Sequence, residues 1–142
     1  MNLPRLVLDT NIVVSALIWG GEPYKLIRAA TEGDVALYTS PALLAELFEV
    51  LGRPHLSSRL AAQHSSVEQA IRQYGELAIS VTPLDTPRAV PNDPDDDHVI
   101  AVALTGQVEL IVTGDRHLLS LLDHQGIDIV RVGEALARIA HA

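Results

Sequence analysis

The chain has 142 residues, of which 48% are hydrophobic and 20% charged, so its composition predicts one globular domain over residues 1–142 and excludes a disordered chain. It contains no cysteine, which excludes disulfides, thiolate zinc sites and cysteine nucleophiles and leaves oxygen and imidazole as metal ligands. The formal net charge of −8 argues against a broad basic surface for nucleic acid, although a cation at the four aspartates within residues 93–97 would reverse the local sign.

The N-terminal stretch runs directly into an apolar segment that ends at Asp9, without a basic region followed by a long apolar core. We therefore expect no secretory signal and a cytoplasmic protein. The longest apolar runs, such as residues 12–14, are too short and too interrupted to cross a bilayer, so we expect no membrane role.

Short β-rich apolar runs alternate with longer stretches at helical spacing, which is typical of an α/β fold with a parallel sheet covered by helices. Strands are expected near residues 6–8, 35–38, 79–81, 110–113 and 127–130. Helices are expected between them, and in particular from Pro41, with Ser40 before it as the cap, to a stop near Gly52. Further helices are expected over residues 66–77, 96–104 and 133–139. The segment from Pro83 to Pro94, with four prolines, is the expected loop before the acidic cluster.

Two of the expected strands end at an aspartate. Asp9 follows the first strand and Asp115 follows the strand over residues 110–113. In open parallel sheets, ligands collect at the carboxyl ends of strands near the point where strand order reverses, so both positions suit a catalytic carboxylate. Capping of the helix that follows explains each aspartate singly, and for Asp9 alone the cap is the slightly better explanation.

Asp97 is a third acid, and it favours a site. On a helix that begins near Asp95, position 97 shares a face with the apolar residues 100, 101 and 104, whereas Asp95 and Asp96 point away from that face. Burying a carboxylate costs roughly several kcal/mol unless it is paired or binds a cation. The alternative, an acid favoured by the helix dipole, gains only about 0.3–1 kcal/mol.

Glu46 is the candidate for a fourth acid. Helical geometry places it at the edge of the apolar stripe formed by Leu43, Leu47 and Val50, whereas Glu49 lies nearly opposite the centre of that stripe. An ordinary boundary glutamate is the alternative, and it is at least as good an explanation if Glu46 is considered without the other acids.

Four converging carboxylates repel one another, so a folded site needs protonation or hard cations such as Mg²⁺ or Mn²⁺. One or two such ions activate water and stabilise in-line attack at phosphorus, which makes phosphodiester hydrolysis the functional hypothesis. Asn11, Thr113 and, ranked below them, Ser15 lie close enough in sequence to the proposed ligands to support them by hydrogen bonds. Local capping is the alternative for all three.

Four short motifs, in this order, resemble the PIN-domain family and especially its bacterial VapC-like toxin branch: Leu8-Asp9-Thr10-Asn11, Ser40-Pro41 with Glu46-Leu47, Asp93-Pro94-Asp95-Asp96-Asp97 followed by Ala101 and Ala103, and Val112-Thr113-Gly114-Asp115. The resemblance implies a three-layer α/β/α domain with a central parallel sheet of about five strands, Mg²⁺ or Mn²⁺ bound by the four acids, and endonucleolytic cleavage of RNA. It also implies an antitoxin partner and a homodimer. The chain departs from the branch at His98, where lysine is common, and at Val132-Gly133, where Thr-Pro is common, and these departures bear on substrate contacts.

Two other classes of function compete with a nuclease. A PIN-like module that binds RNA or protein without cleaving it would keep the fold, but retention of all four acids argues against it. A phosphatase of the haloacid-dehalogenase type would need an aspartate at position 11, where this chain has Asn11. Nucleotide-binding folds are disfavoured because the chain has neither a G-x-G-x-x-G nor a G-x-x-x-x-G-K motif.

Overall fold

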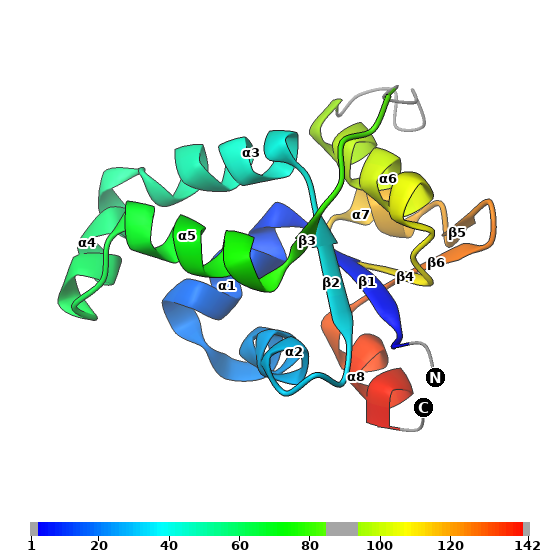
Figure 1. The fold of residues 1–142 in the computed structure, drawn as a ribbon, viewed down its shortest axis with the longest axis horizontal. Helices are drawn as coiled ribbons and strands as arrows, with labels where there is room; N and C mark the ends of the chain where they lie inside the picture. Colours follow the sequence, from blue (N-terminus) through cyan, green and yellow to red (C-terminus); the bar gives the residue numbers. More distant parts are fainter. Residues whose placement is uncertain (1–2, 85–93, 141–142) are drawn as a thin grey trace.

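A computed structural model describes residues 3–84 and 94–140, and Figure 1 shows its α/β architecture. The strands are β1 (Arg5–Leu8), β2 (Ala36–Thr39), β3 (Ile79–Ser80), β4 (Leu110–Val112), β5 (Asp123–His124) and β6 (Ile127–Val130). The helices are α1 (Thr10–Trp19), α2 (Gly21–Thr31), α3 (Pro41–Leu51), α4 (Pro54–Ala62), α5 (Val67–Leu77), α6 (Pro94–Gly106), α7 (Arg116–Leu119) and α8 (Val132–Ala140). Most of the expected loop from Pro83 to Pro94 lies outside the described residues.

The strands form one sheet in the order β3-β2-β1-β4-β6-β5, with every pair parallel except β5 and β6. The chain first adds β2 and β3 on one side of β1, and then crosses to add β4 and β6 on the other side. The strand order therefore reverses between β1 and β4, and this is the position where open α/β sheets bind their ligands.

Successive residues of the central strands contribute to two different hydrophobic clusters, one on each face of the sheet. Leu6 and Leu8 of β1 belong to a cluster that includes residues of α1, α2, α4, α5 and α8, whereas Val7 belongs to a cluster with residues of α6 and α7. Strands buried on both faces need continuous apolar sequence, as β1 and β4 have. The predicted α/β/α fold around a parallel sheet is therefore confirmed.

Helix α6 is buried on more sides than its sequence pattern predicted. The expected stripe at Ile100, Ala101 and Leu104 is present, but Val99 and Val102 are also fully buried. The reason is that α6 packs against β1, β2 and β4 and also touches α3. At its last residue, a Cβ built on Gly106 would lie 2.8 Å from the Tyr38 ring, so α6 approaches β2 too closely for any larger side chain without a shift. The expectation for Asp95 and Asp96 concerns side chains outside the described part of the structure.

Helices α2 and α4 and strand β5 were not predicted individually. Helix α3 ends at Leu51 as expected, but the chain restarts at once as α4, with Pro54 in the first turn, where its missing N–H costs nothing. Strand β5 pairs with β6 through a two-residue turn at Gln125 and Gly126, which both have positive φ, the geometry of a tight hairpin. The expected five parallel strands thus gain a short antiparallel edge.

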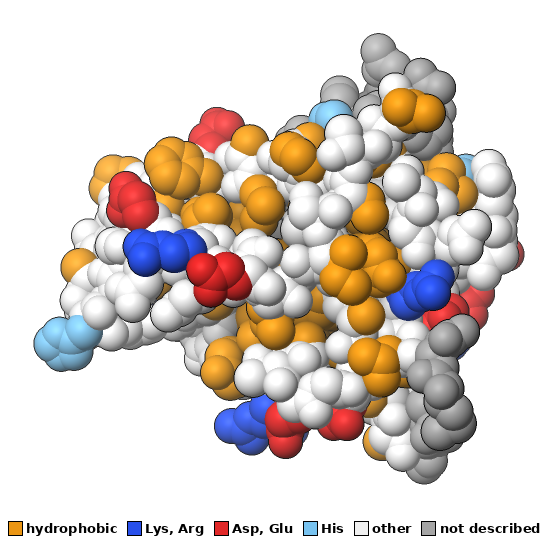
Figure 2. Space-filling view, in the orientation of Figure 1, with side chains coloured by type: hydrophobic (Ala, Val, Ile, Leu, Met, Phe, Trp, Pro, Cys, Tyr) orange, Lys and Arg blue, Asp and Glu red, His pale blue; other side chains and the backbone are white. Residues whose placement is uncertain are grey.

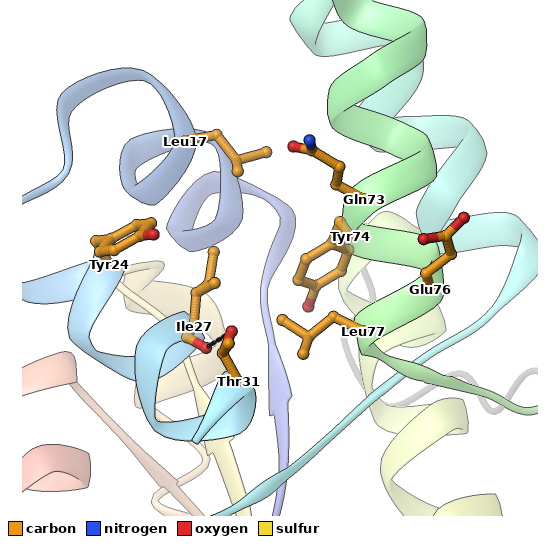
Figure 3. A pocket seen from close by; sticks show the side chains of 8 residues that line it. All are labelled: Leu17, Tyr24, Ile27, Thr31, Gln73, Tyr74, Glu76 and Leu77. Atoms are coloured by element: carbon orange, nitrogen blue, oxygen red, sulfur yellow. Dashed lines mark hydrogen bonds between the residues drawn. The ribbon is translucent and has the colours of Figure 1, made fainter. Parts of the chain in front are cut away.

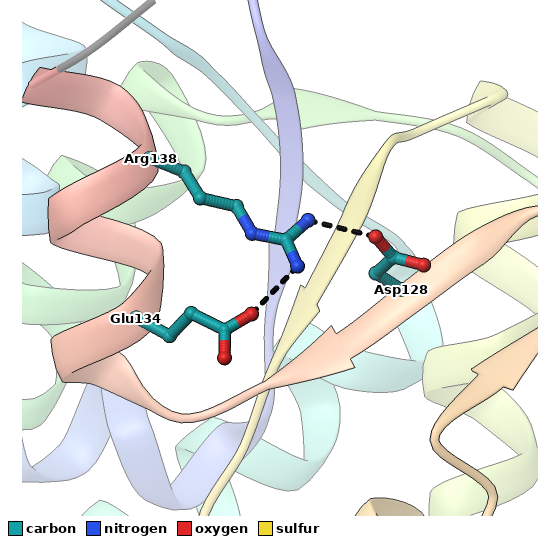
Figure 4. A network of polar contacts seen from close by, with 3 residues as sticks. All are labelled: Asp128, Glu134 and Arg138. Atoms are coloured by element: carbon teal, nitrogen blue, oxygen red, sulfur yellow. Dashed lines mark hydrogen bonds and ion pairs between the residues drawn. The ribbon is translucent and has the colours of Figure 1, made fainter.

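The surface combines apolar and charged regions. Hydrophobic side chains gather along α3 and beside β2 and β3 on the face shown in Figure 2. Of the large apolar residues in these elements, Phe48 of α3 is 50% exposed and Ile79 of β3 is 46% exposed. Elsewhere, Arg138 of α8 forms exposed ion pairs with Asp128 of β6 at 2.7 Å and with Glu134 at 2.6 Å (Figure 4). Exposed pairs of this kind contribute about 0–1 kcal/mol each.

In the described segments, no helix combines the length and apolar character that crossing a membrane requires.

Helices α1, α2 and α5 leave between them a cavity of about 410 Å³ (Figure 3). Apolar side chains, including Leu17, Ile27 and Leu77, form part of its lining, and Gln73 and Glu76 add polar groups. Tyr74 lies on the same lining but is buried, and this burial raises the pKa of its phenol well above the ordinary value. The cavity lies on the α1, α2 and α5 side of the sheet, and its lining includes none of the four predicted metal ligands.

Candidate functional site

Asp9 lies at the carboxyl end of β1, where its backbone N–H donates to the Val112 carbonyl of β4 at 2.9 Å. It occupies the N-cap position of α1, but its side chain makes no capping hydrogen bond. Instead, Oδ2 accepts a hydrogen bond from the Thr113 hydroxyl at 2.8 Å, and Asp9 is only 6% exposed. The capping explanation that the sequence slightly favoured for Asp9 is therefore wrong, because a neighbouring strand supplies a partner for the carboxylate.

Thr113 connects three strands and two of the predicted ligands. Its N–H donates to the Val130 carbonyl of β6 at 3.0 Å, and its side chain is fully buried. The hydroxyl donates its one proton to Asp9 and accepts a hydrogen bond from the Asp115 N–H at 2.9 Å. Because the hydroxyl both donates and accepts a hydrogen bond, its orientation is fixed. Its proton points to Asp9 Oδ2, which suits an ionised carboxylate.

Asp115 does act as a cap, as the local alternative predicted. Its Oδ1 accepts hydrogen bonds from the N–H groups of His117 at 2.6 Å and Leu118 at 3.4 Å, at the start of α7. Both bonds end on the same oxygen, so capping engages one side of the carboxylate. Asp115 is half-buried and joined through its own N–H to Thr113, which places it beside the carboxyl ends of β1 and β4.

Asp97 and Glu46 come from the two helices that pack near this edge. Asp97 lies at the end of the first turn of α6 and is 1% exposed, which confirms that it faces the interior. Glu46 of α3 is half-buried whereas Glu49 is exposed, as the stripe argument predicted. Helix α3 starts directly after β2, with Ser40 as its cap: the Ser40 hydroxyl oxygen accepts a hydrogen bond from the Leu43 N–H at 3.2 Å.

The structure joins part of the predicted site by hydrogen bonds. Asp9, Thr113 and Asp115 form one connected unit at the point where the strand order reverses. Within residues 3–84 and 94–140, no three His, Asp or Glu side chains are grouped so that they could hold a metal ion. The four-acid metal cluster therefore stays a prediction. Of the supporting residues, Asn11 is exposed and Ser15 half-buried on α1, and Thr113 is the one that bonds to a predicted ligand.

Sequence reasoning missed a second feature at this edge of the sheet. A cavity of about 220 Å³ is lined by Ser40, Pro41, Ala42, Thr82, Pro83 and His98. Ser40 had been considered as a helix cap and His98 as a departure from a family pattern, but Thr82 had not been singled out. The available signal was positional, because Ser40 and Thr82 follow two strands that end at the same edge as β1.

Comparisons with known proteins agree with this architecture. The family model described as the PIN domain matches residues 5–117 of the chain. Among solved structures, the chain is similar to FitAcB from Neisseria gonorrhoeae, with a TM-score of 0.58 and 16% sequence identity over 90% of this chain and 98% of that one. At this identity the likeness is one of fold. Among curated proteins, no significant sequence match was found.

Proposed function

Because the chain belongs to the PIN-domain family, we propose that it is a metal-dependent endoribonuclease that hydrolyses RNA phosphodiester bonds. The observation that carries this proposal is the buried Asp9, held by the Thr113 hydroxyl at the point of strand-order reversal. A cap does not need such an arrangement, and a carboxylate placed there without function would lose solvation for little structural gain.

The donor set fits one or two hard cations, Mg²⁺ or Mn²⁺. Both prefer oxygen ligands, and Mg²⁺ typically keeps several waters and takes only one or two carboxylates, with substrate phosphate completing its shell. A group of three protein carboxylates in contact is therefore not required before substrate binds. In this proposal Asp9 and Asp97 are the principal ligands, and Asp115 and Glu46 are the acids that complete the site. The bound cation supplies water activation and neutralises phosphate charge.

The protein's own residues have distinct roles in this proposal. Thr113 orients Asp9 and keeps its Oδ2 as a hydrogen-bond acceptor. The hydrogen bond from the Asp115 N–H to the Thr113 hydroxyl holds the start of α7 beside the carboxyl end of β1. Asn11 and Ser15 are the weaker candidates for contact with water or phosphate. Arg116 and Arg131 are exposed and follow β4 and β6, so they provide positive charge for the RNA backbone at the same edge.

We also propose that the protein is the toxin of a toxin–antitoxin pair, with an antitoxin partner, a homodimeric state and a cytoplasmic location. This part rests on the motif resemblance to the VapC-like branch. Exposed apolar side chains offer surface for protein partners, namely Phe48 on α3, Ile79 on β3 and Trp19 at the end of α1. The cavity between α2 and α5 offers further apolar area.

The decisive experiment is a cleavage assay on a mixed pool of single-stranded RNA with Mg²⁺, Mn²⁺ or chelator. We expect cutting with either metal and none in chelator. Asp9→Asn should abolish cutting, because it keeps the shape of the side chain but removes the charge that holds a cation. Asp34→Asn is the matched control, since Asp34 is exposed and precedes β2, at the opposite edge of the sheet. Equal cutting by the Asp9 variant and the parent would refute the mechanism.

A module that binds RNA or protein without cleaving it is the second candidate. It is favoured by Asp115, whose carboxylate already has a structural role as the cap of α7. Binding of the same RNA pool with no cleavage in Mn²⁺ would establish it in place of the nuclease.

A further inference from the structure

The cavity of about 220 Å³ beside the acidic residues is built from three separate segments. The first turn of α3 contributes Pro41 and Ala42, the segment after β3 contributes Thr82 and Pro83, and α6 contributes His98. These segments lie side by side above the sheet in Figure 1. The Val81 N–H donates to the Thr39 carbonyl at 2.9 Å, which fixes the segment after β3 against the end of β2.

The cavity and the acidic residues share one edge of the sheet. Neighbouring strands lie about 4.8 Å apart, so the ends of β2 and β3 lie about 5 and 10 Å from the end of β1, where Asp9 is located. Asp97 and His98 are consecutive on α6, and consecutive helical side chains diverge by about 100°. One helix can therefore place a carboxylate toward the strand-order reversal and an imidazole in the cavity wall.

The lining suits a flat, neutral, hydrogen-bonding ring. Pro41, Ala42 and Pro83 present apolar surface, and the half-buried His98 adds an aromatic ring. Ser40 uses its oxygen to accept from the Leu43 N–H, which leaves its hydroxyl proton to donate, and Thr82 adds a second hydroxyl. The volume is below the roughly 300–1,000 Å³ of sites for drug-sized ligands, so it suits a single small ring system.

We propose that this cavity is a nucleobase subsite, which holds the base of a nucleotide next to the scissile phosphate and so sets the sequence preference of the nuclease. The proposal rests on the proposed function, because a phosphate at Asp9 would bring its neighbouring base to the ends of β2 and β3. A phosphate group is a poorer occupant, since Pro41 has no N–H and the lining residues that the structure describes include no arginine or lysine.

A titration with neutral nucleosides tests the cavity without metal or cleavage. Adenosine, guanosine, cytidine and uridine are added separately to the full-length protein in chelator, and the backbone amide signals are followed by NMR. We expect at least one nucleoside to shift the amides of Ala42, Thr82 and His98. Ala42→Trp fills the cavity from an exposed position and should weaken this binding about tenfold or more, the scale of losing one stacked base.

Ala61→Trp is the matched control, because Ala61 is an exposed alanine on α4 that does not line the cavity. It should leave nucleoside binding unchanged. Thermal melting shows whether each variant is folded, and His98→Ala provides a second test in which a ring is removed from the wall. No shift with any of the four nucleosides, or shifts that persist in both Ala42→Trp and His98→Ala, would overturn the proposal.

A second measurement connects the cavity to the reaction. Sequencing the products of a randomised RNA should show a preferred base at one position beside the cut, lost at that position in Ala42→Trp and retained in Ala61→Trp. An unchanged preference in Ala42→Trp would refute the subsite. If the parent protein cleaves no RNA, the proposed function fails, while the nucleoside titration still decides whether the cavity binds a base.

Discussion

Replacing Thr113 with valine tests the hydrogen-bonded connection between Asp9 and Asp115. Valine keeps the shape of the buried side chain but removes the donor to Asp9 Oδ2 and the acceptor of the Asp115 N–H. A hydrogen bond to a charged group is worth about 1.5–3 kcal/mol, and an unsatisfied buried N–H costs about 1–3 kcal/mol. Because Asp115 is only half-buried, water can partly replace the second bond, so we expect a loss of about 2–4 kcal/mol in the free energy of unfolding.

Urea unfolding in chelator measures this loss as a fall in the transition midpoint of about 1–2 M for a small domain. Thr113→Ser should recover most of it, because serine keeps the hydroxyl. Thr39→Val is the control, since Thr39 is an equally buried threonine at the end of β2 that takes no part in this chain of hydrogen bonds. Mn²⁺ affinity should fall in Thr113→Val as well, because Asp9 loses its orientation. A midpoint within about 0.3 M of the parent value would refute this account of Thr113.

Three further predictions concern other parts of the molecule. Asp97→Asn should weaken Mn²⁺ binding at least about tenfold while leaving the metal-free fold intact or slightly more stable. Calorimetry of the metal-free variant and a Mn²⁺ titration measure these two effects. Unchanged Mn²⁺ affinity would count against Asp97 as a ligand. Gly106→Ala should lower the free energy of unfolding by about 1–3 kcal/mol, because its Cβ would lie 2.8 Å from the Tyr38 ring. Gly75→Ala has its nearest contact at 3.9 Å and should instead stabilise α5 by about 0.5–1 kcal/mol. Equal urea midpoints for the two variants would contradict this. Burial raises the pKa of Tyr74, so above about pH 10 the unfolded state loses its phenol proton before the native state does, and stability should fall by about 1.4 kcal/mol per pH unit. Unfolding at pH 8 and 11 should show this fall in the parent and a smaller one in Tyr74→Phe, and identical falls would exclude Tyr74 as its source.

Local sequence was sufficient for most of the fold. The uninterrupted apolar runs of β1 and β4 predicted strands buried on both faces, and the Ser40-Pro41 pair predicted the start of α3. The position of each aspartate at a strand end followed from the same pattern. Periodicity also separated the half-buried Glu46 from the exposed Glu49. In each case the physical cause acts within about one helical turn or one strand, so neighbouring residues carry the information.

Tertiary structure decided what those aspartates do. Asp9 and Asp115 have the same local setting, a carboxylate between a strand and a helix, yet Asp115 caps its helix and Asp9 does not. The difference arises because β4 lies beside β1 and brings the Thr113 hydroxyl, 104 residues away in sequence, to Asp9. A carboxylate bonds to whichever donor the packed structure presents, and no local pattern records a donor from another strand. For the cavity beside β2 and β3, the sequence indicates only that Ser40 and Thr82 follow strands that end at one edge. That these residues line a cavity depends on tertiary structure, because only the folded sheet brings its three wall segments together.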